Sequence, residues 1–372
     1  MHLSLLLIDT AFRELRPSEK LPMRVKQGAT TWLRLVCVFI GGRRRPSDDT
    51  RTWRNLISRQ MRMINMKPDS SKITIDNNRN KIRSFLSEVI FAPRANMVKW
   101  ATLTNQTPNL KIGYPGQHLA SLITGMRGTA TGARGEDIVD GTEVKSCSRV
   151  DQVDKCLACG NHVMRCQNTC PSCGSPKIQR NNDSKWLIAI RKSDELEMYL
   201  NRIPRMLFII SDYPNFDTGD FSSIRFTSYE IWNQSPRAIN FRVLLEEYYH
   251  KIFLAHISKN PEKTPAPKNF WPYSQQFYLC NPIKTFEYIV YEANSTHPDI
   301  DIRHYVEPDA DRGPLPSVDM PIKLLNKKEY GILRRKGIDV DNLEYIDEGM
   351  RAMLSLRGTS KAKPQKSVYK RH

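Results

Sequence analysis

The sequence predicts a mixed α/β (α+β) fold in which helices flank a sheet and a cysteine-rich insertion interrupts the chain. Apolar runs of strand length lie at 186–190 (WLIAI), 206–210 (MLFII) and 286–291 (FEYIVY). Two CxxC motifs between residues 156 and 173 mark the insertion. Because 40% of the residues are hydrophobic, the chain has enough apolar side chains for a folded core.

Three segments with the apolar spacing of helices surround these runs. Residues 78–89 and 240–256 each carry apolar side chains spaced along one helix face. Residues 117–125 (QHLASLITG) predict a shorter helix that ends at a glycine, a common helix stop. A last helical region is expected at 322–356, where the turn around Gly337 could form a helix-turn-helix.

The charge of the chain favours a nucleic-acid partner. Lys and Arg number 57 against 39 Asp and Glu, a formal net charge of +18, and phosphate neutralisation supplies non-specific affinity for such a protein. A solvated basic surface is the alternative interpretation. No apolar stretch reaches the ~18–20 residues of a membrane span, and Leu3–Ile8 is too short and lacks the preceding basic region of a secretory signal. We therefore expect a cytoplasmic protein that binds no membrane.

The run Glu143-Val144-Lys145 is a candidate catalytic strand. Alternate residues of a strand project from one face, so Glu143 and Lys145 would point together while Val144 packs behind them. A carboxylate can bind a hard cation such as Mg²⁺, and an adjacent lysine can orient a water or offset charge on a phosphodiester transition state. Glu-x-Lys alone is common as a surface charge pair, so the interpretation depends on its context.

A second carboxylate is needed to fix the metal, and Glu136, Asp137 and Asp140 are the candidates. Asp140-Gly141 is typical of a two-residue hairpin turn before the candidate strand. In an ideal hairpin of this length, Glu136 shares the face of Lys145 and Asp137 does not. Asp137 reaches the metal only if the loop is wider or a bulge shifts the register.

The segments 116–125 (GQHLASLITG) and 132–156 (GARGEDIVDGTEVKSCSRVDQVDKC) resemble the MamI-type type II restriction endonucleases. These belong to the PD-(D/E)xK nucleases and share a compressed, MutH-like motif. The resemblance implies a nuclease core with a mixed central sheet flanked by helices. It also implies that Asp137 is the first metal-binding acid, Glu143 the second and Lys145 the catalytic lysine, with Mg²⁺ as the catalytic cofactor.

This chain departs from the MutH-like pattern at one position. That pattern places a further glutamate on the preceding helix, where this sequence has Ala120. Gln117 or His118 could take its place, or the contact could be absent.

Four cysteines predict a structural zinc site. The chain contains eight cysteines, and six lie between Cys147 and Cys173, which is metal-site spacing rather than a scattered disulfide framework. Each CxxC pair is followed by a glycine, and a closed Cys₄ set leaves no open coordination position, so the zinc would be structural rather than catalytic. His162 and Cys166 are competing ligands, and Cys147 is expected to be buried beside the catalytic strand. The predicted ligands are Cys156, Cys159, Cys170 and Cys173.

Two groups of polar side chains are candidates for DNA contact. One surrounds the cysteines and could either touch the DNA backbone or belong to an insertion that only braces the core; both interpretations stay open. The other mixes an aromatic with Arg, Asn and Gln, the types that read base edges, although ordinary loop residues are equally compatible. The first group is Arg149, Lys155, Arg165, Lys177 and Arg180, and the second is Trp232, Asn233, Gln234, Arg237, Asn240, Arg242, Gln275 and Gln276.

Four parts are predicted along the chain. Residues 1–69 form a poorly defined N-terminal arm, and 70–260 form the nuclease core, which contains the zinc ribbon 156–173. Residues 261–356 are expected to serve DNA recognition or dimerisation. The end, 357–372, is basic and predicted to be disordered.

The resemblance implies a type II restriction endonuclease that makes Mg²⁺-dependent double-strand cuts in DNA and leaves 5′-phosphate ends. The implied target is an interrupted palindrome similar to GATNNNNATC. One catalytic centre per chain predicts a homodimer on such a site, and a cognate DNA methyltransferase is expected in the same system. The alternatives are a MutH-like repair nickase and a non-catalytic zinc-ribbon DNA-binding protein.

Overall fold

The computed structural model describes residues 66–108, 112–130, 136–295 and 297–357. Within the described part, no helix is both long and apolar enough to cross a membrane. Nearly all of the predicted N-terminal arm and of the predicted basic tail lies outside the described residues.

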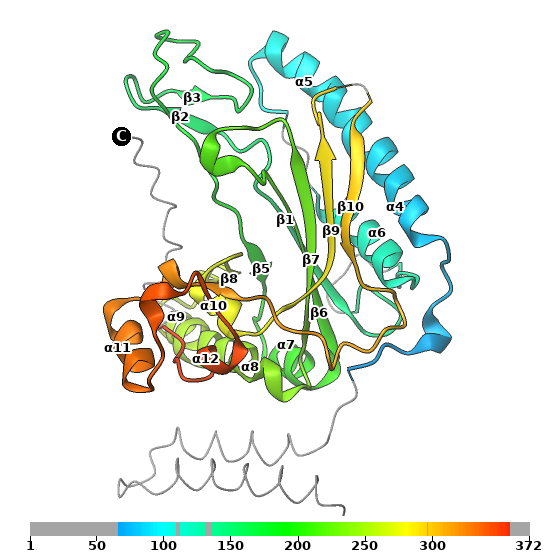
Figure 1. Cartoon of the computed structure of the whole chain (residues 1–372), viewed down its shortest axis with the longest axis vertical. Helices are drawn as coiled ribbons and strands as arrows, with labels where there is room; N and C mark the ends of the chain where they lie inside the picture. Colours follow the sequence, from blue (N-terminus) through cyan, green and yellow to red (C-terminus); the bar gives the residue numbers. More distant parts are fainter. Residues whose placement is uncertain (1–65, 109–111, 131–135, 296, 358–372) are drawn as a thin grey trace, which may run out of the picture. The chain divides into compact units, whose positions relative to one another are not determined.

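A five-stranded mixed sheet forms the centre of the described residues (Figure 1). Its first two strands are parallel and all other neighbours are antiparallel. The mixed α/β architecture predicted from the sequence is therefore confirmed. The order across the sheet is β1 (Glu143–Ser148), β6 (Arg205–Asp212), β7 (Ile224–Trp232), β9 (Ile283–Tyr291) and β10 (Asp299–Tyr305).

Two of these strands, β7 and β10, were not expected from the sequence. Arg225 and Glu230 interrupt the hydrophobic pattern of β7, and charged residues alternate along β10. Strands β9 and β10 lie after residue 260, so the central sheet includes residues on both sides of the predicted division between core and C-terminal region.

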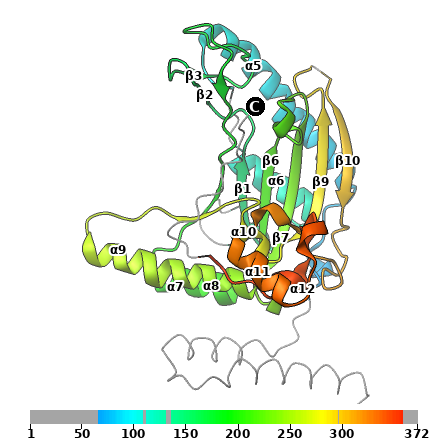
Figure 2. The same ribbon diagram turned by 60° about the vertical axis from the view of Figure 1, so that its left-hand side comes forward.

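Strand β6 explains why helices cover both faces of the sheet. All eight of its residues are buried. Met206, Phe208 and Ile210 belong to one hydrophobic core, and the alternate residues Leu207 and Ile209 belong to another. A strand that is apolar on both sides requires a cover on each face, and Figure 2 shows helices on either side of the sheet.

One face is covered by a long helical segment and by α6. The predicted helix 78–89 continues to residue 104 through a π-helical turn, and the predicted helix 117–125 forms with Gly125 as its left-handed C-cap. The elements are α4 (Asn78–Phe85), η2 (Leu86–Phe91), α5 (Ala92–Thr104) and α6 (Gly113–Thr124).

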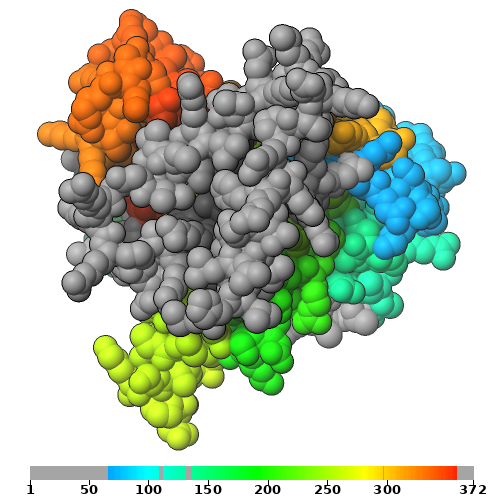
Figure 3. All heavy atoms as spheres, turned by 90° about the horizontal axis from the view of Figure 1, so that it is seen from below, coloured from blue at the N-terminus to red at the C-terminus, as the bar shows by residue number. Residues whose placement is uncertain are grey.

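The other face packs against a second group of elements. The run 186–190 forms a strand, but this strand pairs with β8 in a separate two-stranded ribbon and not with the central sheet. The predicted helix 240–256 also forms, and Figure 3 shows its end, α9, projecting from the described surface. The elements are β5 (Trp186–Ile188), α7 (Ser193–Glu197), η3 (Met198–Arg202), α8 (Ile239–Glu247), η6 (Tyr248–Phe253), α9 (Leu254–Lys259), β8 (Lys268–Phe270) and α10 (Gln275–Leu279).

The predicted helix-turn-helix around Gly337 is wrong. After α11 (Lys327–Arg335) the chain makes a short 3-10 turn, and the next α-helix, α12 (Glu348–Arg351), has only four residues. Leu333 and Val340 are buried in the core on the ribbon side of the sheet, so this segment packs on the domain and presents no free second helix.

The remaining elements are short. A small sheet built around the cysteine-rich segment contains β2 (Asp154–Cys156), β3 (His162–Val163) and β4 (Ile178–Gln179), and β11 (Met320–Pro321) pairs with β12 (Tyr345–Ile346). The 3-10 turns are η1 (Ser70–Lys72), η4 (Phe216–Thr218), η5 (Pro236–Ala238), η7 (Ile322–Leu324) and η8 (Val340–Asn342).

Candidate active site and cysteine cluster

Strand β1 places Glu143 and Lys145 on one face at the edge of the sheet. The Nζ atom of Lys145 contacts Oε1 of Glu143, and the Glu143 side chain is only 3% exposed. Val144 points to the opposite side and is buried in the core beneath α6. The alternation predicted for this run is confirmed, and Cys147, two residues further on, is buried as expected.

The turn before β1 is one residue wider than an ideal two-residue hairpin. The N–H of Ile138 donates to the carbonyl of Thr142 at 3.1 Å, and the N–H of Gly141 donates to the carbonyl of Ile138 at 2.9 Å, so residues 139–141 form the loop. This register brings Asp137 beside β1, where its Oδ2 accepts from the backbone N–H of Val144 at 2.7 Å. The loop is therefore wider than two residues, which is the condition under which Asp137 can lie on the same side as Glu143 and Lys145.

The two competing carboxylates lie elsewhere. Glu136 is exposed, with a positive φ of 51°, and Asp140 pairs with Arg205 at 2.7 Å. Of the three candidates, Asp137 is the one that shares a cleft with Glu143 and Lys145.

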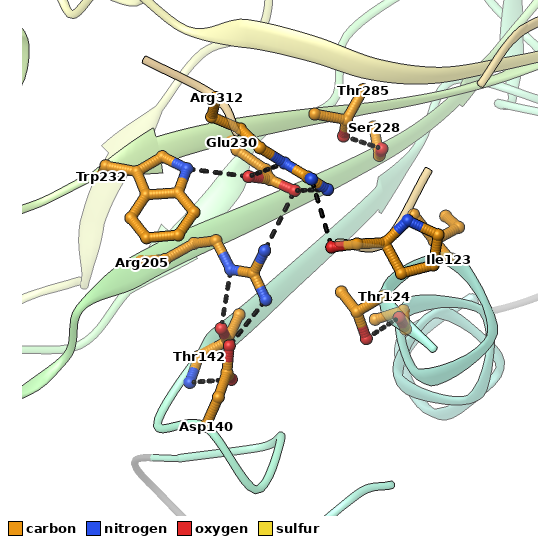
Figure 4. Close-up of polar contacts among 12 residues, drawn as sticks. Ile123, Thr124, Asp140, Thr142, Arg205, Ser228, Glu230, Trp232, Thr285 and Arg312 are labelled. Carbon is orange, nitrogen blue, oxygen red and sulfur yellow. Dashed lines mark hydrogen bonds and ion pairs between the residues drawn. The ribbon is translucent and has the colours of Figure 1, made fainter. Parts of the chain in front are cut away.

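Arg205, the first residue of β6, fixes the turn (Figure 4). Its guanidinium bonds Oδ2 of Asp140 at 2.7 Å and Oγ1 of Thr142 at 2.9 Å, so it holds both ends of the loop. The same group pairs with Glu230 on β7 at 3.2 Å. The buried side chains of two neighbouring strands therefore set the position of the segment that carries Asp137.

Both carboxylate oxygens of Glu230 have partners among the neighbouring side chains. Its oxygens accept from Trp232 Nε1 at 2.8 Å and from Arg205, and Arg312 lies 3.4 Å away. Burial alone would raise the pKa of Glu230, but the positive charges of Arg205 and Arg312 outweigh burial and lower it. Glu230 is thus held as a carboxylate although it is 1% exposed.

Helix α6 supplies one further polar group to the cleft. Nε2 of Gln117 donates to Oδ1 of Asp137 at 2.7 Å. The helix can approach β1 this closely because Gly116 lies against Ser146: a Cβ added to this glycine would stand 1.9 Å from the serine Oγ. Ala120, where the MutH-like pattern has a glutamate, is fully buried in the core. Between the two residues considered for its place, the exposed His118 packs near Phe85, and Gln117 contacts the acid.

The electrostatics of the cleft fit a bound cation. Burial raises the pKa of Asp137, and it also raises the pKa of Glu143 despite the opposing effect of Lys145. Oε2 of Glu143 is buried and has no hydrogen-bond partner in the described part of the chain. Two partly desolvated carboxylates, with one acceptor oxygen unsatisfied, are the donor set that a hard divalent cation would stabilise.

Tyr199 is a residue of the cleft that the sequence did not reveal. It lies on the π-helical turn η3, and its hydroxyl donates to Oε1 of Glu143 at 3.4 Å. Burial raises its pKa well above the ordinary value, so the hydroxyl remains a donor. Because 56 positions separate Tyr199 from Glu143 and it belongs to no motif, only the folded chain shows the contact.

The four cysteines of the paired CxxC motifs converge on one point. Their Sγ atoms all lie within 4.8 Å of one another, with 3.7 Å between Cys156 and Cys173 and 3.6 Å between Cys159 and Cys170. The glycines that follow the pairs have φ of 77° and 68°, as the tight turns require. His162 and Cys166, the competing candidates, are exposed and lie outside the cluster.

The base of the cysteine insertion is anchored by a buried acid. Asp154 accepts from Arg165 at 2.8 Å and from Arg180 at 2.8 Å, and the Arg165 guanidinium stacks over the Phe221 ring at 4.8 Å. These two arginines therefore brace the insertion against the domain. Lys155 and Lys177 are exposed, so only part of the basic group around the cysteines is available to a partner.

The side chains expected to read bases are all used within the protein. Asn233, for example, is fully buried and donates to two backbone carbonyls, and Arg237 pairs with Glu348 at 2.8 Å. The others also donate to backbone carbonyls or carboxylates, so the structure does not support this group as a DNA-reading surface. The full set is Trp232, Asn233, Gln234, Arg237, Asn240, Arg242, Gln275 and Gln276.

Two comparisons with known proteins point to the same family. The family model for the MamI restriction endonuclease matches residues 99–323, which include the cleft and the cysteine cluster. The type II restriction enzyme MamI of Microbacterium ammoniaphilum is 35% identical over 78 residues, a match that covers 20% of this chain and 25% of that enzyme. No solved structure gives a significant match. Because the family model covers more than half of its length, the chain belongs to the MamI restriction endonuclease family.

Proposed function

We propose that the protein is a type II restriction endonuclease with a PD-(D/E)xK catalytic centre formed by Asp137, Glu143 and Lys145. The observation that carries this proposal is the meeting of these three side chains in one cleft of a chain from this family. Asp137 and Glu143 would hold Mg²⁺ through their carboxylates. Because the matched relative is covered over only 25% of its length, its activity supports the proposal by analogy alone.

The cleft residues have distinct tasks in phosphodiester hydrolysis. The divalent cation, when bound, supplies Lewis-acid stabilisation of the phosphate and a more acidic water. Lys145 hydrogen-bonds the attacking water and offsets the charge that accumulates on the phosphate oxygens. Gln117 keeps Asp137 oriented, and Tyr199 donates to Glu143. Water adds to phosphorus as the bond to the 3′ oxygen breaks, which leaves a 5′-phosphate and a 3′-hydroxyl.

We further propose that the cysteine cluster holds a structural Zn²⁺. A tetrahedral site with Zn–S bonds of ~2.3 Å has sulfur–sulfur edges of about 3.8 Å, close to the 3.6 and 3.7 Å seen here. The local apolar core contains only Val163 and Ile178 besides cysteines, so the metal would supply most of the folding energy of this insertion.

Exchange of one ligand tests the zinc proposal. Cys159→Ser should remove about one zinc per chain in metal analysis and lower the thermal stability of the insertion. Cys166→Ser, an exposed cysteine outside the cluster, is the matched control and should keep the metal. Zinc retained at the wild-type level in the Cys159 variant would overturn the proposed ligand set.

Assembly and target follow from the proposed reaction. A double-strand cut by one centre per chain favours a homodimer on a palindromic site, with an interrupted sequence similar to GATNNNNATC as the proposed target. The nuclease core would include 70–260 together with the later strands of the central sheet. Such an enzyme would act in the cytoplasm beside a DNA methyltransferase that protects the host genome.

Digestion of phage DNA separates the candidate functions. Purified, zinc-loaded protein with Mg²⁺ should give discrete fragments, which is the result expected for a restriction enzyme. Nicks or a smear would favour a repair nickase, and uncut DNA would favour a binding protein without catalysis.

A further inference from the structure

The β5–β8 ribbon has one buried face and one open face. In β5, Trp186 and Ile188 are fully buried, whereas Leu187 between them is 48% exposed. The period-two alternation continues at both ends, with Lys185 exposed and Ile190 buried. An exposed leucine between two core residues indicates a surface whose outward side chains are not used for packing.

Strand β8 adds an amide to the open face. Its register pairs Asn269 with Leu187 and Phe270 with Trp186, and Phe270 is buried, so Asn269 projects outward beside Leu187. Within the described ranges, the side-chain amide of Asn269 makes no hydrogen bond. Asn269 thus differs from the asparagines at 233 and 240, whose amides bond to backbone carbonyls.

The open face is continuous with the candidate active site. Leu187 and Ala189 line the same cleft as Glu143 and Lys145. At the other end, the Lys185 ammonium lies 4.7 Å from the centre of the Trp271 ring, and no described carboxylate pairs with it. A duplex positioned for cleavage would therefore meet an amide and an apolar side chain side by side, and then a cation.

This combination matches the chemistry of a DNA groove. A two-stranded ribbon fits the major groove of B-DNA, which is about 12 Å wide, and an asparagine amide can make paired hydrogen bonds to adenine N6 and N7. An apolar side chain suits the thymine methyl group, and a lysine suits phosphate. Because the side-chain amide of Asn269 bonds to no other described residue, such a contact would break no hydrogen bond within the described part of the protein.

We propose that the open face of the β5–β8 ribbon enters the major groove and that Asn269 discriminates an adenine within the recognition site. Leu187 contacts the adjacent thymine methyl, and Lys185 contacts the phosphate backbone. This inference rests on the proposed endonuclease function and assigns its sequence reading to a surface outside the set predicted from the sequence.

Cleavage of a randomised double-stranded DNA library tests the assignment. The wild type with Mg²⁺ should enrich one recognition sequence among the cut products. Asn269→Ala should cut with roughly 10- to 100-fold lower discrimination at one base pair of each half-site and unchanged preference elsewhere. Asn269→Asp, which can only accept hydrogen bonds, should move the preference at that position from adenine towards cytosine.

Two further variants distinguish reading from folding. Asn240→Ala removes an asparagine amide that bonds inside the protein, so it should lower stability and leave the sequence preference unchanged. Lys185→Ala should keep the preference but weaken binding uniformly and reduce the salt dependence of affinity by about one phosphate.

The outcomes separate this inference from the proposed function. If the wild type cuts at a defined sequence and both Asn269 variants keep its preference, the ribbon does not read bases. If the wild type cuts nothing, DNA that binds to the wild type and to Asn269→Ala in Ca²⁺ is selected from the same library, and the two sequence preferences are compared. A wild-type sequence preference lost in Asn269→Ala would then support the ribbon without the nuclease, and a wild type that selects no sequence would overturn both.

Discussion

Glu143 and Glu230 are both buried glutamates near β6, but their surroundings are opposite. Glu230 is 1% exposed and Glu143 is 2% exposed. Glu230 has partners for both oxygens and a lowered pKa, whereas Glu143 has an oxygen without a partner and a raised pKa. Burial costs a carboxylate free energy unless charges or hydrogen bonds compensate it. The chain compensates this cost at Glu230 and leaves it partly uncompensated at Glu143.

The difference supports the proposal that Glu143 binds a cation that the protein itself does not supply. A fold that supplies two arginines and an indole N–H to one glutamate can satisfy a buried acid. At Glu143 the nearest groups are Lys145, Tyr199 and the second acid Asp137, whose charge raises the pKa further. A divalent cation would supply the missing positive charge, and its binding would then stabilise the folded protein.

Neutralising the unsatisfied glutamate gives the largest expected effect. Glu143→Gln should reduce DNA cleavage at least about 100-fold, because one of two proposed metal-binding carboxylates is lost. The same change should not lower the melting temperature of the Mg²⁺-free protein, because it removes a buried charge that the protein compensates only in part. Cleavage assays and thermal unfolding of the same samples check both parts. A variant that cuts normally would remove Glu143 from the proposed centre.

The equivalent change at the satisfied glutamate should act on stability. Glu230→Gln leaves Arg205 and Arg312 buried without their central carboxylate, which should cost about 3–5 kcal/mol in urea unfolding. Glu307→Gln, at an ion pair with Arg79 in which both side chains are more than half exposed, is the control and should change stability by about 0.5 kcal/mol or less. If Glu230→Gln and Glu307→Gln lower the free energy of unfolding equally, the ion pairs of Glu230 with Arg205 and Arg312 do not stabilise the fold as described.

A smaller effect is expected from the residue that orients Asp137. Gln117→Ala removes the 2.7 Å hydrogen bond to Oδ1 and should weaken Mg²⁺ affinity roughly 10- to 100-fold, with cleavage partly restored at high Mg²⁺. His118→Ala, on the exposed side of the same helix, is the matched control. Equal Mg²⁺ dependence in the two variants would show that Gln117 is only structural.

The smallest expected effect is a difference in pH dependence between the two glutamates. The folded pKa of Glu143 is raised, so its contribution to stability is present in acid and is lost as pH rises through that pKa. Any stability gained by Glu143→Gln should therefore grow between about pH 4 and pH 8. The pKa of Glu230 is lowered, so the loss caused by Glu230→Gln should shrink as pH falls. Melting temperatures across this range in Mg²⁺-free buffer check both signs.

The predictions that the structure confirms came from short-range sequence patterns. Strand geometry alone predicts the alternation of Glu143, Val144 and Lys145, and the glycine stop signal alone predicts that the helix ends at Gly125. The cysteine cluster was also predictable, because four thiols at paired spacing have few other arrangements.

The unpredicted features depend on contacts distant in the sequence. The register that selects Asp137 over Glu136 is fixed by Arg205, 65 positions from its partner Asp140. The polar side chains expected to read DNA instead donate hydrogen bonds to backbone carbonyls or carboxylates within the protein. The composition of a segment does not show whether its polar side chains bond inside the protein or face DNA. Asn269 is the reverse case, because only the pairing of β5 with β8 shows that its amide faces outward.

Plasmid cleavage by the wild type and by Lys145→Ala is the most direct test that this cleft is a Mg²⁺-dependent nuclease centre. The wild type should convert supercoiled plasmid carrying a site to linear DNA when Mg²⁺ is added and should leave it intact without Mg²⁺. Lys145→Ala should bind the same DNA with similar affinity but cut it at least about 100-fold more slowly. Normal cutting by Lys145→Ala, or cutting by the wild type without any divalent cation, would contradict the proposed centre.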